Sequence, residues 1–159
     1  MPVKLPEQIN AATTPLFEHL PIALAMSQLV VAESGSAASV KLVEHVTRIP
    51  SLHDPLAAGL WLYVDELDRS HRISQGIDDA TGAFWHGIMH RREGDFSNSH
   101  YWFNRVGAHP AMSAIDGYDA HAFIDDVEAA TSRKANADEL IDLQQREWTA
   151  LFQWCAHHP

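Results

Sequence analysis

Residues 85–110 read WHGIMHRREGDFSNSHYWFNRVGAHP, and this stretch decides the predicted fold. Its first half has helical spacing and ends at Glu93-Gly94-Asp95, where glycine and aspartate favour a tight turn. An aromatic-rich second segment follows and runs to Pro110, a residue that interrupts helices. The stretch therefore predicts a helical hairpin.

A weaker copy of this hairpin precedes it in the chain. Residues 59–73 can be laid over residues 87–102, so that Ser70-His71 falls on Ser99-His100. In this overlay the leading glycines, Gly59 and Gly87, are 28 residues apart, and the Ser-His pairs are 29 apart. Hairpins that repeat in this way bury little surface alone and stack on their neighbours. We therefore expect two stacked hairpins between residues 52 and 110.

Helical patterns also dominate the rest of the chain. Asn136 and Glu139 have the spacing of a capping box, and the apolar stripe that follows predicts a long C-terminal helix over residues 137–156, within a C-terminal segment of 136–157. Further helices are predicted over residues 14–25, 40–48, 56–64 and 119–131. Together they predict a single all-α domain, residues 1–159, of about six or seven helices.

Composition narrows the classes of partner. The formal net charge is −10, which disfavours binding to nucleic acid and to anionic membranes. A single cysteine, Cys155, excludes an internal disulfide and lies in an apolar helix stripe, which predicts a buried, inert thiol. The N-terminal residues lack the apolar run of a signal peptide, so we expect a soluble cytoplasmic protein. Five tryptophans leave room for an apolar homodimer contact.

The second hairpin resembles two known families. Gly87, the turn Gly94-Asp95, Ser99, Phe103 and Pro110 resemble a tetratricopeptide or Sel1-type repeat. That resemblance implies a scaffold that binds a protein or peptide. The whole phrase from Trp85, with YWF and the following Val-Gly and His-Pro, resembles a family of uncharacterised bacterial and fungal proteins, from which no activity can be carried over.

The same stretch carries a candidate metal site. His86 and His90 are four residues apart, so their rings can share a helix face, and Glu93 adds a carboxylate one turn later. Two imidazoles and a carboxylate suit zinc, or ferrous iron with open positions. His100 or Asp95 could complete the set. Packing inside the hairpin, with the rings bonded to carbonyl groups or Asp95, is the alternative explanation.

Three further residues are candidates for ligand contact. Arg91 and Arg92 could clamp an anion, and surface ion pairs with Glu93, Asp95 and neighbouring acids are the simpler explanation. Trp102 belongs to an aromatic set that could line a ligand site or fill the core.

The sequence thus leaves two hypotheses open. The first is a non-enzymatic scaffold that binds a protein or peptide. The second is a metal- or small-ligand-binding protein, with or without enzymatic activity, built on His86, His90 and Glu93.

Overall fold

The computed structural model describes residues 3–134 and 137–159, and within them the chain forms eight α-helices, one 3-10 helix and no strand. The all-α prediction is confirmed, with at least one helix more than expected. In chain order the elements are α1 (Glu7–His19), α2 (Ala37–Val46), α3 (Asp54–Tyr63), α4 (Leu67–Ser74), α5 (Ala80–Glu93), α6 (Phe96–Val106), η1 (Pro110–Ala114), α7 (Ala120–Arg133) and α8 (Asp138–His157).

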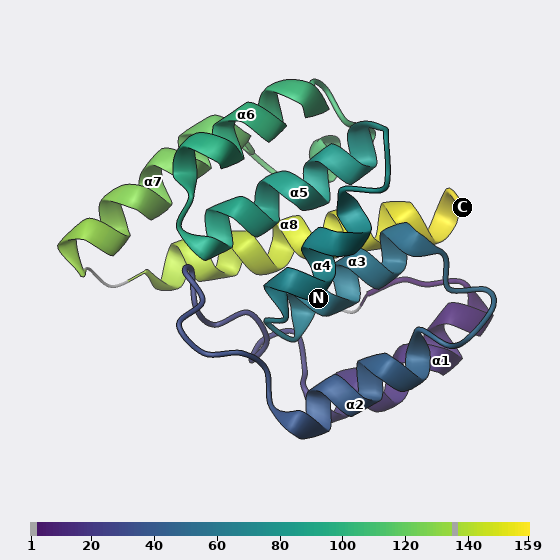
Figure 1. Cartoon of the computed structure of the whole chain (residues 1–159). Helices are drawn as coiled ribbons and strands as arrows, with labels where there is room; N and C mark the ends of the chain where they lie inside the picture. Colours follow the sequence, from purple (N-terminus) through teal and green to yellow (C-terminus); the bar gives the residue numbers. More distant parts are fainter. Residues whose placement is uncertain (1–2, 135–136) are drawn as a thin grey trace.

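The middle of the chain is a row of helices that pack in sequence order (Figure 1). α3 packs on α4, α4 on α5, α5 on α6, and α6 on α7. The long α8 crosses this row and packs on α3, α7 and η1, while α1 and α2 form a pair that joins the row through α3. The two predicted hairpins are therefore α3–α4 and α5–α6, and they stack through α4 and α5.

Local chemistry explains where these helices begin and end. The side chains of Asp79, Asp95 and Asp119 accept hydrogen bonds from backbone N–H groups in the first turns of α5, α6 and α7. Such caps satisfy donors that have no partner inside the helix. α5 ends at Gly94, whose φ of 86° is the left-handed conformation that glycine adopts most easily.

The two hairpins share a turn and a serine hydrogen bond at positions 29 residues apart. Asp65 and Gly94 hold the same turn position, with φ of 64° and 86°. Ser70 donates to the carbonyl of Ala58 at 2.8 Å, and Ser99 donates to that of Gly87 at 2.7 Å. Ala58, and not Gly59, is therefore the counterpart of Gly87. The overlay of the two glycines, 28 residues apart in the sequence, was wrong by one residue.

Gly87 lies where α5 packs closely against Phe103 of α6. A Cβ atom there would lie 2.8 Å from two ring carbons of Phe103, which is itself buried. We expect Gly87→Ala to destabilise the fold by about 1–2 kcal/mol, because overpacking outweighs the gain in helix propensity. Urea unfolding measures this, with Gly76→Ala as control, since its Cβ would meet its nearest atom at 3.4 Å. Equal stability of both variants would contradict the close approach.

The N-terminal helix differs from the prediction. Residues 14–25 were expected to form a helix begun by Pro15, but α1 runs from Glu7 to His19 with Pro15 inside it. Pro15 cannot donate to the carbonyl four residues earlier, and both Pro15 and Ala11 are exposed, so water can solvate that carbonyl. Ile9 and Leu16 anchor the helix in the core.

The C-terminal helix confirms the prediction closely. α8 spans Asp138–His157, and its stripe buries Trp148, Leu151, Phe152 and Cys155. The predicted cap, Asn136, lies outside the described residues. Gln144, the polar residue of the stripe, is buried and donates to the carbonyls of residues 26 and 28. Among the described residues, no helix is long and apolar enough to cross a membrane.

Candidate functional site

Three histidines meet where α4 packs on α5. His71 comes from the end of α4, and His86 and His90 come from one face of α5. Their candidate ligand nitrogens all lie within 4.8 Å of one another. The side chains of His86 and His90 are almost buried, at 4% and 6% exposed, whereas His71 is half-buried. The predicted convergence of the two α5 rings is therefore present, with a third ring beside them.

Glu93 holds the ring of His90. Its Oε1 lies 2.6 Å from His90 Nδ1, within one turn of α5. A carboxylate only accepts hydrogen bonds, so the proton of a neutral His90 ring sits on Nδ1 and donates to Glu93. The lone pair is then on Nε2. Glu93 thus acts on His90 from outside the three-histidine group.

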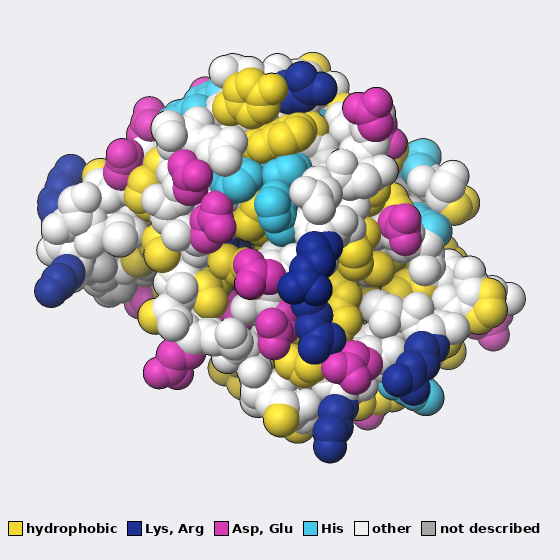
Figure 2. Space-filling model, in the orientation of Figure 1, with side chains coloured by type: hydrophobic (Ala, Val, Ile, Leu, Met, Phe, Trp, Pro, Cys, Tyr) yellow, Lys and Arg dark blue, Asp and Glu magenta, His cyan; other side chains and the backbone are white. Residues whose placement is uncertain are grey.

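Trp102 of α6 covers the cluster from one side. Its indole stacks on His86 with ring centroids 3.8 Å apart and planes 13° apart. His86 in turn stacks on His90, at 4.8 Å. Arg105 lies over the indole, 5.5 Å from its centroid. Figure 2 shows histidine side chains reaching the surface on this face, beside a strip of hydrophobic atoms.

His86 is held in its neutral form. Burial first of all, and then the neighbouring His90 and His71, together lower the pKa of its ring from 6.5 to about 4. Its Nδ1 is buried and has no hydrogen-bond partner among the described residues. A neutral imidazole with an unused nitrogen is the form that binds a metal ion.

The lowered pKa of His86 predicts an acid-dependent loss of stability. Between pH 6.5 and about pH 4 the ring takes up a proton in the unfolded chain but not in the folded one. The free energy of unfolding therefore decreases as the pH is lowered through this range. We expect His86 to contribute a loss of about 2 kcal/mol between pH 7.5 and pH 4 in the metal-free protein. His86→Phe keeps a ring against Trp102 and removes this proton.

The measurement is urea unfolding at several pH values. The wild type should lose more stability than His86→Phe across this window. Burial also lowers the pKa of His53 and of His109, so both proteins retain some dependence on pH. Identical profiles for the two proteins would show that His86 is not the group responsible.

His100 does not join the cluster. Its Nδ1 lies 2.7 Å from Nδ1 of His121, and its Nε2 lies 2.9 Å from Asp125, on the side facing α7. The expectation that His100 completes the ligand set is therefore wrong, and His71 takes that place. The sequence does show that Ser70-His71 matches Ser99-His100, but it does not show which helix each histidine faces. In the stacked hairpins each of the two histidines faces the helix that follows its own, so that His71 meets α5 and His100 meets α7.

Asp95, the other proposed fourth ligand, lies near His90 and Glu93, with ligand atoms of the three within 4.8 Å of one another. Its oxygens accept from the backbone N–H and the side-chain amide of Asn98. Asp95 therefore serves as the cap of α6.

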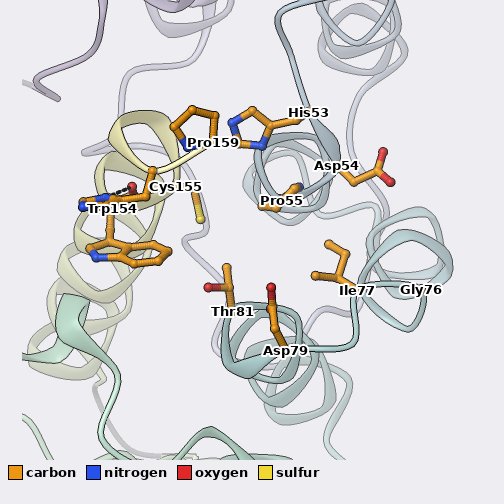
Figure 3. Close-up of a pocket in the computed structure, with 11 residues that line it drawn as sticks. His53, Asp54, Pro55, Gly76, Ile77, Asp79, Thr81, Trp154, Cys155 and Pro159 are labelled. Atoms are coloured by element: carbon orange, nitrogen blue, oxygen red, sulfur yellow. Dashed lines mark hydrogen bonds between the residues drawn. The ribbon is translucent and has the colours of Figure 1, made fainter.

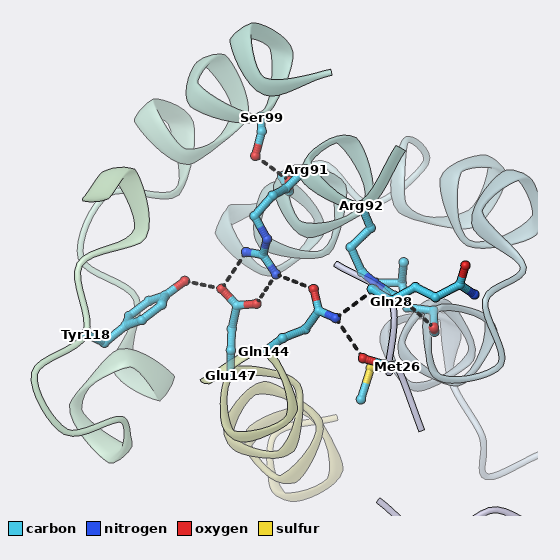
Figure 4. A network of polar contacts seen from close by, with 10 residues as sticks. Met26, Gln28, Arg91, Arg92, Ser99, Tyr118, Gln144 and Glu147 are labelled. Carbon is cyan, nitrogen blue, oxygen red and sulfur yellow. Dashed lines mark hydrogen bonds and ion pairs between the residues drawn. The ribbon is translucent and has the colours of Figure 1, made fainter. Parts of the chain in front are cut away.

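Arg91 and Arg92 are fully buried and point away from the solvent (Figure 4). Arg91 forms two hydrogen bonds to Glu147, at 3.0 and 2.7 Å. Arg92 donates to Asp65 at 2.7 Å and to the carbonyls of residues 62 and 28. The predicted surface pairs with Glu93 and Asp95 are absent from the described interactions, and neither guanidinium is free to clamp an external anion.

A pocket of about 610 Å³ lies elsewhere (Figure 3). It opens between the start of α3, the start of α5 and the end of α8. Its lining consists of His53, Asp54, Pro55, Gly76, Ile77, Asp79, Thr81, Trp154, Cys155, His158 and Pro159. Burial raises the pKa of the Cys155 thiol to about 12, so it stays protonated and is a poor nucleophile. None of the three clustered histidines lines this cavity.

The histidine cluster is thus the feature of the structure best suited to bind a ligand or a metal ion. Comparison of the chain with family models, curated proteins and solved structures finds no match.

Proposed function

We propose that this protein binds a divalent transition-metal ion, with zinc the best fit, through His71, His86 and His90. The observation that carries the proposal is the approach of three imidazole nitrogens to within 4.8 Å of one another. Zinc–nitrogen bonds of about 2.0–2.1 Å in a tetrahedral site place ligand nitrogens roughly 3.4 Å apart. Small side-chain rotations would close the difference.

The surroundings of the cluster support a metal in two ways. The hydrogen bond from His90 to Glu93 has the form of the carboxylate–histidine pair that orients metal-binding imidazoles in proteins. The stack of Trp102 on His86 limits rotation of that ring and excludes water from one side. Both features reduce the reorganisation that metal binding requires.

The ligand types favour zinc over ferrous iron. Two histidines and a carboxylate are the typical iron(II) set, whereas three imidazoles are a zinc set. Glu93 is bonded to His90 Nδ1 and is 38% exposed at its side chain, which suits an orienting role. Three protein ligands leave a fourth position for water, and half-buried His71 gives that position a route to solvent.

The test is zinc titration of metal-free, untagged protein by calorimetry, repeated with Co(II) and visible spectroscopy. We expect one tight site in the wild type and a loss of affinity of more than about 100-fold in His71→Asn and His90→Asn, since ligand removal should exceed the effect of removing an orienting partner. His45→Asn removes an exposed histidine of α2 and should bind as the wild type. Wild-type affinity in His71→Asn would contradict the proposal.

Binding of a protein or peptide by the hairpins, and formation of a homodimer, stay predictions. Among the described residues, the large hydrophobic side chains that are exposed are Leu24 and Tyr101. Two such residues supply little of the contiguous apolar surface that a partner helix or peptide needs. The histidine cluster is therefore the better-supported basis for function.

A further inference from the structure

A second pair of histidines lies between α6 and α7, apart from the three-histidine cluster. Nδ1 of His100 faces Nδ1 of His121 at 2.7 Å, and the two rings are parallel to within 1°. The other nitrogen of His100, Nε2, lies 2.9 Å from Oδ1 of Asp125. His100 and His121 are half-buried and Asp125 is exposed, so the pair is open to solutes.

The 29-residue repeat relates this pair to the first cluster. His71 and His100 follow Ser70 and Ser99, which make equivalent hydrogen bonds to the first helix of each hairpin. Each histidine therefore points from the second helix of its hairpin toward the next helix in the row. His71 meets histidines of α5, and His100 meets His121 of α7. The repeat thus brings histidines of successive helices together both between α4 and α5 and between α6 and α7.

We propose that His100 and His121 form a second metal site, selective for Cu(II), in which both Nδ1 atoms are ligands. The distance between the two Nδ1 atoms indicates which metal geometry fits. Two nitrogens about 2.0 Å from a metal lie roughly 2.8 Å apart when the angle at the metal is 90°, and roughly 3.4 Å apart in a tetrahedral site. The observed 2.7 Å is close to the separation of two adjacent ligands in the square-planar geometry of Cu(II), which the rings reach by turning both Nδ1 lone pairs toward one point. Copper(II) also binds nitrogen ligands more tightly than zinc does.

The protons balance without a co-reactant. His100 donates from Nε2 to the carboxylate of Asp125, so its Nδ1 holds a lone pair. His121 fills the short contact by donating its Nδ1 proton to that lone pair. When Cu(II) takes the place of this proton, His121 becomes protonated at Nε2 instead. A neutral pair therefore binds the metal with no net release of protons, and Asp125 keeps His100 in the ligating tautomer.

The test uses a background in which His71, His90, His157 and His158 are replaced by glutamine, so that neither the three-histidine cluster nor the C-terminus contributes a copper signal. Cu(II) is titrated while electron paramagnetic resonance and calorimetry are recorded. We expect one bound Cu(II) with hyperfine coupling to two nitrogens. His121→Asn should weaken this binding at least tenfold, and His45→Asn, which removes an exposed histidine of α2, should leave it unchanged.

The two sites are judged separately. Loss of zinc binding on His71→Asn reports on the proposed function, whereas loss of copper binding on His121→Asn reports on the second site. Equal copper affinity in His121→Asn and its background would overturn the second site, as would a spectrum with no two-nitrogen coupling. Long-range nitrogen–proton spectra of the same background give a second check: substoichiometric Cu(II) should broaden the ring signals of His100 and His121 before those of other histidines.

Discussion

Arg91→Met is expected to lower the free energy of unfolding by about 3–5 kcal/mol, the largest effect of any substitution considered. Arg91 and Glu147 are both fully buried and share two hydrogen bonds. Tyr118 donates its hydroxyl to the same carboxylate, and Gln144 accepts from Arg91 at 3.4 Å (Figure 4). Methionine fills similar space but leaves the carboxylate buried without its cation.

Two comparisons make this prediction specific. Arg91→Met combined with Glu147→Leu removes both charges and should recover a large part of the lost stability. Arg146→Met breaks an exposed pair with Asp142 in the same helix as Glu147, and should cost about 0.3–0.5 kcal/mol. Urea unfolding with a constant m value measures all three variants. A loss below 1 kcal/mol for Arg91→Met alone would contradict the importance of the buried pair.

Glu93→Ala is expected to weaken zinc binding by about 10- to 100-fold while leaving the metal-free fold largely intact. The hydrogen bond from His90 Nδ1 fixes both the orientation of that ring and the nitrogen that carries its lone pair. Without Glu93, the ring can rotate and change tautomer, and part of the binding energy is used to restore it. Because Glu93 is 38% exposed, its pair with His90 adds less than about 1 kcal/mol to stability.

Calorimetry of the metal-free protein with zinc measures this change, and urea unfolding without metal checks the fold. Glu44→Ala removes a carboxylate of similar exposure, which pairs with Arg69 between α2 and α4, and should not change zinc affinity. If Glu93→Ala lowered the stability of the metal-free protein but kept wild-type zinc affinity, Glu93 would be a structural residue only.

The sequence predicted the helices best where local signals agreed. The stripe and length of α8 and the glycine turn after α5 act within a few residues, so their effects can be read from the chain. The prediction is least accurate for α1: the sequence predicts that a helix starts at Pro15, but Pro15 lies inside the helix. Its tolerance inside the helix depends on solvent exposure, which only the tertiary packing sets.

The candidate site was predicted in part, for a similar reason. His86 and His90 share a face because of their spacing on one helix, and this was read correctly. The partners of Arg91 and Arg92 were sought among neighbours in sequence, but Glu147 lies 56 residues from Arg91. The third histidine depends on which helix packs against α5. Such contacts depend on which helices pack against one another, more than on the spacing of residues along one helix.

The two equivalent turns of the repeat reach one shape by different chemistry. Asp65 adopts a left-handed backbone that costs a residue with a side chain about 1 kcal/mol or more, while Gly94 adopts it freely. Asp65 offsets that cost because its carboxylate neutralises the guanidinium of Arg92. The turns are therefore not interchangeable. Glycine at position 65 would relax the backbone but leave the buried Arg92 cation without its carboxylate, and aspartate at position 94 would add backbone strain and place a Cβ 3.4 Å from Val30.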